Sequence, residues 1–205
     1  MRKNILPFLL VLIVLFGCKS TPATENTTEG ALTTSGSWLE NEMSNTTQCG
    51  FFYTSPETVN PTSYEVEFKK ESGYSKAAFG IIFGYTANEK GLLENYNRFE
   101  INIDGEYALY QVSGSTYTDL IEANNNNTAY FIPSSAIKKG YAQTNTLKLE
   151  FSDNTYSCYI NGTQVTKSIP VSTNGENKAL SFFSVGKENQ EMFPGTPVKI
   201  SYRIK

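Results

Sequence analysis

The chain of 205 residues has no histidine, three cysteines and one tryptophan. Histidine is the commonest general base and a common transition-metal ligand, so catalysis here would have to use carboxylates, tyrosine or lysine. Basic residues are also few, 17 against 20 acidic ones. They form no track for phosphates and are not interleaved with aromatic residues, so we do not expect the chain to bind nucleic acid.

The chain has one long apolar run, at its N-terminus. Arg2 and Lys3 precede an almost wholly apolar segment at 5–16, which is followed by Gly17 and Cys18. About 12 residues at roughly 1.5 Å each cover about 18 Å, too little for a hydrocarbon core of about 30 Å. We therefore expect residues 1–17 to be a signal peptide that is removed.

Gly17 and Cys18 after an apolar run resemble the end of a bacterial lipoprotein signal, although Phe16 stands where such signals usually carry a smaller residue. The resemblance implies a diacylglyceryl thioether on the Cys18 sulfur and usually a further acyl chain on its nitrogen. Two or more acyl chains hold a protein on a membrane, whereas a protein with a single acyl chain would detach. The alternative is an ordinary secretory peptide that ends near a cysteine. Lys19 and Ser20 lack the aspartate that commonly marks inner-membrane retention, which favours the outer membrane of the cell envelope.

Residues 18–36 have the composition of a disordered tether. Apart from Cys18 they are mainly Thr, Glu, Asn, Ser, Pro and Gly, which cannot repay the entropy of ordering. Such a tether spans on the order of 25 Å. The remaining residues, 37–205, are enough for one domain. Without residues 1–17 the chain has 15 basic and 20 acidic residues, a formal charge of −5.

Alternating side chains predict an all-β domain. Tyr64, Val66 and Phe68 alternate with charged residues, which is typical of a strand with one buried and one wet face. Asp104-Gly105 and Asn161-Gly162 are typical of tight hairpin turns, since these residues tolerate positive φ. Ten or more short strands and no convincing helix predict a β-sandwich or barrel. Further alternating segments lie at 79–85, 99–103, 147–151, 156–160, 180–185 and 198–204.

Two cysteines remain after Cys18 is assigned to the lipid anchor. Cys158 alternates with Tyr156 and Ile160, so we expect it to point inward. Cys49 and Cys158 could form a disulfide in an oxidising compartment, or both could be buried thiols.

A further resemblance rests on two segments. Residues 79–83 read Phe-Gly-Ile-Ile-Phe, and residues 158–162 read Cys-Tyr-Ile-Asn-Gly. From about residue 64 to about residue 165 the chain resembles the concanavalin A-like, or laminin-G-like, jelly rolls of exported bacterial proteins. The resemblance implies a jelly-roll sandwich of two antiparallel sheets, one of them concave, and often a carbohydrate ligand. Fold alone does not fix a ligand.

The glucanase branch of that family carries a Glu-x-Asp-x-x-Glu run that supplies its nucleophile and acid. This chain lacks that run. Glu65 with Glu67, and Glu100 with Asp104, are the nearest pairs of carboxylates, and spacing alone does not exclude either pair. The missing motif counts against an enzyme.

Carbohydrate sites combine aromatic faces with planar polar groups. Four residues alternate in the segment 96–102 on the face opposite Phe99 and Ile101: Tyr96, Arg98, Glu100 and Asn102. They are the first candidates for ligand binding. The alternative is an ordinary wet sheet face, on which Arg98 and Glu100 serve only solubility.

Tyr110 and Tyr117 are secondary candidates, and both could simply pack. No cofactor is expected. A calcium site on Asp104, Asp119 or the asparagines at 124–127 is chemically possible because oxygen ligands suit that ion. No EF-hand spacing marks such a site, and we predict no metal.

We predict a lipid-anchored exported protein that binds carbohydrate without catalysis, with a glycan or polysaccharide as its partner. A protein-binding adhesin or a structural envelope protein, with an envelope or host protein as partner, is the alternative. A carboxylate-based glycoside hydrolase ranks third. Tethered copies that bind one polymer would gain avidity from multivalency.

Overall fold

The computed structural model describes residues 37–43, 50–53, 58–59, 62–89, 93–121, 131–152, 154–166, 168–170, 178–185 and 196–205. These residues form fifteen β-strands and no helix. Within them, no helix has the length and apolarity needed to span a membrane. The predicted signal peptide (1–17) and tether (18–36) lie outside the described residues.

All strand pairs are antiparallel, and the strands form two sheets. The seven-stranded sheet has the order β1-β15-β4-β10-β11-β12, and β13 also pairs with β11. Its strands are β1 (Leu39–Met43), β4 (Ser63–Ser72), β10 (Thr144–Ser152), β11 (Thr155–Ile160), β12 (Thr163–Gln164), β13 (Ile169–Pro170) and β15 (Val198–Ile204).

The eight-stranded sheet has the order β2-β14-β5-β6-β7-β8, with β3 on β14 and β9 on β7. Its strands are β2 (Gly50–Tyr53), β3 (Thr58–Val59), β5 (Phe79–Ala87), β6 (Leu93–Ile101), β7 (Glu106–Ser113), β8 (Thr116–Asp119), β9 (Ile132–Pro133) and β14 (Lys178–Val185).

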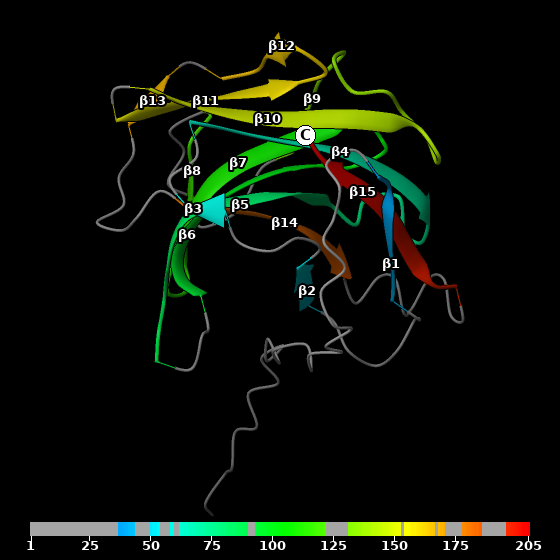
Figure 1. The fold of residues 1–205 in the computed structure, drawn as a ribbon, viewed down its shortest axis with the longest axis horizontal. Coiled ribbons are helices and arrows are strands. Elements are labelled where there is room, and N and C mark those ends of the chain that lie inside the picture. Colours follow the sequence, from blue (N-terminus) through cyan, green and yellow to red (C-terminus); the bar gives the residue numbers. More distant parts are fainter. Residues whose placement is uncertain are drawn as a thin grey trace, which may run out of the picture.

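The two sheets stack face to face as a sandwich (Figure 1). In the view of Figure 1, β10 and β11 belong to the upper layer, and β5, β6 and β14 to the lower layer. At one end β6 and β7 bend away from the upper layer, so the outer face of the eight-stranded sheet, turned away from the seven-stranded sheet, is concave. The predicted two-sheet all-β sandwich is confirmed.

The main core fills the space between the sheets. Phe83 packs edge-on against Tyr156 at a centroid distance of 4.6 Å, and Phe68 packs against Phe79 at 5.3 Å. Cys158 is fully buried in this core, as the alternation predicted. Burial raises the pKa of its thiol. Cys49 lies outside the described residues, so its pairing with Cys158 stays a prediction.

Both predicted hairpin turns are confirmed. Gly105 has a φ of 94°, and the adjacent Asn161 and Gly162 have φ values of 50° and 81°. Asn102 stabilises the first turn, because its side-chain oxygen accepts hydrogen bonds from the main-chain N–H groups of Asp104 and Glu106, each at 3.1 Å.

One detail of the predicted alternation is wrong. Phe79, Ile81 and Phe83 face the main core as expected, but Tyr85 belongs to a second cluster on the outer face. Gly84, with a φ of 55°, lies where the pairing of β5 with β6 shifts register. That irregularity breaks the two-residue period and turns Tyr85 to the opposite side.

Among the described residues, the hydroxyl of Tyr156 is buried in the core without a hydrogen-bond partner. An unpaired buried hydroxyl costs about 1–3 kcal/mol. We therefore expect Tyr156→Phe to raise the free energy of unfolding by about 1 kcal/mol in urea denaturation. The matched control is Tyr107→Phe, which removes a buried hydroxyl that donates to the main-chain oxygen of Val165 at 3.1 Å and should destabilise the protein. An equal loss of unfolding free energy in the two variants would contradict this account of Tyr156.

Candidate functional site on the outer face of the eight-stranded sheet

The outer face of the eight-stranded sheet carries its own buried cluster, separate from the main core. Its polar part consists of Arg98 and Glu100 on β6 and Tyr110 on β7, here called the Arg98–Glu100–Tyr110 cluster. The apolar and aromatic residues of this face are Ile82, Tyr85, Tyr96, Ala108, Tyr110, Val112, Leu180 and Phe182. Leu93, Tyr117 and Phe131 are partly buried and pack against them.

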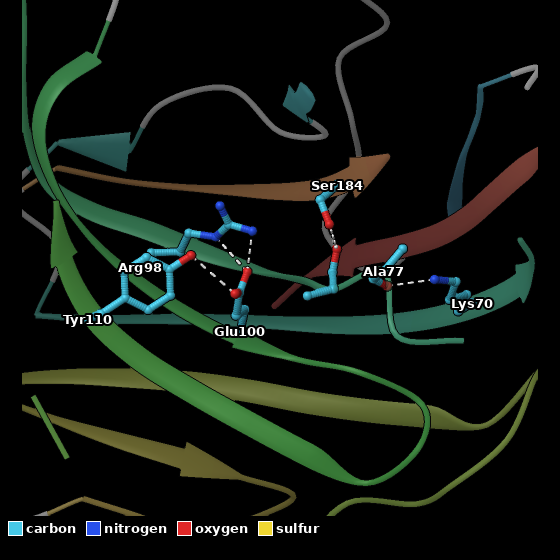
Figure 2. Close-up of polar contacts among 7 residues, drawn as sticks. Lys70, Ala77, Arg98, Glu100, Tyr110 and Ser184 are labelled. Atoms are coloured by element: carbon cyan, nitrogen blue, oxygen red, sulfur yellow. Dashed lines mark hydrogen bonds and ion pairs between the residues drawn. The ribbon is translucent and has the colours of Figure 1, made fainter. Parts of the chain in front are cut away.

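Arg98 and Glu100 form an ion pair in which two nitrogens of the guanidinium, Nε and an Nη, contact Oε2 of Glu100. The hydroxyl of Tyr110 donates to the other carboxylate oxygen, Oε1, at 3.2 Å. Figure 2 shows the three side chains together on the side of the sheet that is turned away from the seven-stranded sheet. Both carboxylate oxygens of Glu100 are therefore hydrogen-bonded, as a buried charge requires.

Strand register brings these residues together. Arg98 lies between Ile82 on β5 and Tyr110 on β7. Glu100 lies between Gly80 and Ala108, the smallest residues of the face. A Cβ atom added at Gly80 would lie 2.0 Å from the main-chain oxygen of Phe99, so β5 and β6 can approach this closely only with glycine at this position.

Aromatic rings line the ion pair. The Cζ atom of Arg98 lies 4.6 Å from the ring centroid of Phe182 and 5.6 Å from that of Tyr110. These distances are within the range of cation–π attraction, which strengthens when the cation is desolvated. Tyr117, which is half-buried, packs on Tyr110 with a centroid distance of 5.7 Å.

Burial dominates the electrostatics of the cluster. It raises the pKa of Glu100, and the ion pair with Arg98 opposes that shift. Burial also raises the pKa of Tyr110, and the neighbouring carboxylate of Glu100 adds to the rise. Burial tends to lower the pKa of Arg98, but the charge of Glu100, its hydrogen bond with Arg98 and the nearby Tyr110 and Tyr96 together raise that pKa, so the guanidinium stays protonated.

The structure brings five of the six predicted ligand-binding candidates to this face. Tyr96, Arg98, Glu100, Tyr110 and Tyr117 lie on or against it. Asn102 follows the end of β6, and its side chain serves the hairpin turn by donating to Glu106 at 2.8 Å. The wet-face alternative is wrong: Arg98 is 6% exposed and Glu100 2%.

The outer face of the seven-stranded sheet is different, because its ion pairs are partly exposed. Lys148 pairs with Glu150 at 2.6 Å, and Lys205 with Glu67 at 2.7 Å. Such pairs contribute little to stability. The wet face expected for β4 is not found at Glu67, which is 7% exposed and whose carboxylate is paired with Arg203 and Lys205.

The structure assigns turn and loop contacts to the two aspartates considered for calcium. Asp104 accepts a hydrogen bond from Ser75 at 3.1 Å, and Asp119 accepts one from the main chain of Ile121 at 2.8 Å. In the described part of the chain, no group of three or more acidic, histidine or cysteine side chains could hold a metal ion. The asparagines at 124–127 lie outside that part.

Sequence reasoning missed three residues of this face. It left open which side of the strand at 180–185 faces inward, and so overlooked Phe182, which stacks on Arg98. It also gave no role to Gly80 and Ala108, which flank Glu100. The available signal was the two glycines in the segment 79–85, Gly80 and Gly84, which indicated a nearly bare strand face where neighbouring groups could approach the main chain.

No protein-family model matches the chain, and no curated protein matches it. Among solved structures, it is similar to a Bacteroides ovatus mixed linkage glucan GH16 protein in complex with a product, with a TM-score of 0.50 and 12% identity over 76% of this chain and 73% of that chain.

Two other solved structures are less similar in shape. Bacillus licheniformis beta-glucanase has a TM-score of 0.47 and 14% identity, over 82% of this chain and 75% of that chain. The carbohydrate binding module CBM66 from Bacillus subtilis has a TM-score of 0.46 and 8% identity, over 79% of this chain and 91% of that chain. The comparison with the Bacteroides ovatus protein shows the fold alone: the chain is a jelly-roll sandwich of the concanavalin A-like type.

The buried ion pair makes a testable prediction about stability. Arg98→Met leaves the carboxylate of Glu100 buried without its cation, so we expect the free energy of unfolding to fall by about 3–5 kcal/mol. The double variant Arg98→Met/Glu100→Leu removes both charges and should recover most of that loss. Urea denaturation measures all three proteins.

The control is Lys148→Met, which breaks an exposed pair and should change stability little. A loss from Arg98→Met no larger than that of the control would contradict a buried ion pair.

Proposed function

We propose that the protein is an exported, lipid-anchored protein that binds carbohydrate on the outer face of the eight-stranded sheet, without catalysis. The observation that carries the proposal is the Arg98–Glu100–Tyr110 cluster, bordered by aromatic rings on a concave sheet face. Sugar rings have apolar sides that pack on aromatic faces, and hydroxyls that pair with planar polar groups. This face contains groups of both kinds.

Solvent reaches the residues of the proposed site to different extents. Tyr117 is half-buried and packs on Tyr110, whereas Tyr110 is 3% exposed. We therefore assign the aromatic contact with a sugar ring to Tyr117. Arg98 and Glu100 form the rigid polar floor that fixes Tyr110, and through it Tyr117, in place.

Binding without catalysis is favoured because both oxygens of Glu100 are already hydrogen-bonded. A glycoside hydrolase uses two carboxyl groups, about 5 Å apart for retention or roughly 6.5–9.5 Å apart for inversion. Asp104, the other member of the candidate pair, is exposed in the hairpin turn and bonded to Ser75. Glu100 and Asp104 thus have different partners and different surroundings.

A lipid anchor would increase the avidity of a binding site whose single contacts are weak. The lipid on Cys18 keeps every copy at the membrane surface, where several copies meet one polymer and the later contacts become intramolecular. Residues 18–36 would hold the domain clear of the headgroups. The lipoprotein-like sequence around Cys18 supports this part of the proposal.

We expect the protein to be retained on at least one polysaccharide of a glycan array, and Tyr117→Ala to weaken that retention about tenfold or more, because a stacked aromatic contact contributes on the order of 1–2 kcal/mol. The control is Tyr159→Ala, a half-buried tyrosine on β11 in the other sheet, which should bind as the wild type does. Circular dichroism checks that both variants fold.

A blank array, or equal loss in the two tyrosine variants, would contradict carbohydrate binding at this face. Release of reducing sugar from the bound polysaccharide, abolished by Glu100→Gln, would instead support a hydrolase.

The anchor is tested separately. Mass spectrometry of the protein from its native organism should find a new N-terminus at Cys18 carrying two or more acyl chains. We expect Cys18→Ser to shift the protein from the membrane fraction to the soluble fraction. An unmodified, uncleaved N-terminus in the wild type would overturn the anchor and leave the proposal for the sheet face intact.

A further inference from the structure

A lysine side chain is buried at one end of the sandwich. Lys70 on β4 continues the inward-facing row of Val66 and Phe68, and it is 1% exposed. Its Nζ donates hydrogen bonds to the main-chain oxygens of Tyr74, at 2.5 Å, and Ala77, at 2.6 Å. Figure 2 shows the contact of Lys70 with Ala77. Both acceptors belong to the connection 73–78, which leads from β4 in one sheet to β5 in the other.

Other contacts hold the same connection from neighbouring segments. The hydroxyl of Tyr141 donates to the main-chain oxygen of Gly73 at 2.6 Å. Ser75 donates to Asp104 at 3.1 Å, and its main-chain oxygen accepts from the N–H of Ile103 at 3.3 Å. The connection 73–78 is thus held by the hairpin turn at 103–104 and by Tyr141 in the loop before β10. The amine of Lys70 adds hydrogen bonds to the connection from inside the sandwich.

The surroundings of the amine favour its uncharged form. A neutral amine has two N–H donors, which matches the two carbonyl acceptors, whereas an ammonium has three. Burial lowers the pKa of Lys70 to about 7, and the charge of Asp104 in the hairpin turn opposes this shift.

In the described part of the chain, the other titratable groups near Lys70 lie in the connection 73–78 and in the loop between β9 and β10. They are Tyr74 and Lys76 in the connection, and Tyr141, whose own pKa is raised by burial and by Asp104. On β15 the residue paired with Lys70 is Ile200, which is apolar and fully buried.

We propose that Lys70 is a pH-sensitive latch: its uncharged amine holds the connection 73–78 closed, and its protonation favours an opened connection in which the ammonium reaches water. The latch would act on the start of β5, since the main-chain oxygen of Ala78 accepts hydrogen bonds from the N–H and Oγ of Ser184, at 2.8 Å and 2.9 Å. Two residues further on, Gly80 packs against the main chain beneath Glu100.

The direction of the pH effect follows from the two forms of the lysine. In water the amine has a pKa near 10.5, and in the closed form about 7. Between these pKa values the opened form binds one more proton than the closed form. The free energy that favours the closed form therefore increases as pH rises from about 7 to about 10.5. Below about pH 7 both forms are protonated, and closure is at its weakest and constant.

Hydrogen exchange of the mature protein tests the latch at pH 7, 8 and 9. For amides of the connection 73–78, the opening equilibrium constant, corrected for intrinsic exchange, should fall about fivefold from pH 7 to 8 and about ninefold from pH 8 to 9 in the wild type. In Lys70→Met it should not change with pH. In Lys70→Arg, which stays charged, it should also be constant, and larger than in Lys70→Met.

A pH-independent opening constant in the wild type, or the wild-type slope in Lys70→Met, would overturn the proposal. An NMR titration of the Lys70 side-chain carbon next to Nζ, in the wild type alone, decides the matter even where neither variant folds. A midpoint near pH 7 is expected, and a midpoint near 10 overturns the latch.

Discussion

The ion pair between Arg98 and Glu100 is the constraint on which the outer face of the eight-stranded sheet depends. Two charges removed from water cost several kcal/mol each unless geometry and further hydrogen bonds compensate. The compensation comes from three strands: Tyr110 on β7 donates to the carboxylate, Phe182 on β14 covers the guanidinium, and Gly80 on β5 permits close approach. A change of register in any of these strands would remove one of these supporting contacts, although the two charges, both on β6, would stay paired.

A face organised in this way suits recognition because its polar groups are already oriented. Glu100 cannot rotate away from Arg98 and Tyr110 without breaking hydrogen bonds, so a ligand would not have to order them. Tyr117 adds an aromatic ring at the side that solvent reaches. On the outer face of the seven-stranded sheet, the buried carboxylate of Glu67 is also bonded at both oxygens, by Arg203 and Lys205, but these two cations are partly exposed.

Local patterns in the sequence predicted the architecture well, because alternation and turn chemistry are local properties. Val66, Leu147 and Cys158 point inward as their period of two requires, and Asn161-Gly162 forms the expected turn. Burial of the second face could not be predicted, since alternating Tyr96, Arg98 and Glu100 look the same on a wet face and on a buried polar one. The identity of the strands that flank β6 is a non-local property, and so is the position of Gly80 and Ala108 beside Glu100. The inward-facing Lys70 broke the expected pattern, and its two carbonyl acceptors explain why it is tolerated.

The central claim is that Arg98 and Glu100 form a desolvated ion pair on the outer face of the eight-stranded sheet, and nitrogen-15 NMR of the Arg98 side chain tests it most directly. The account predicts a resolved Nε–Hε resonance whose proton exchanges with water far more slowly than that of a free arginine, because the group is buried and bonded to Glu100. Exchange at the rate of an exposed arginine would contradict the account and with it the polar floor of the proposed binding face.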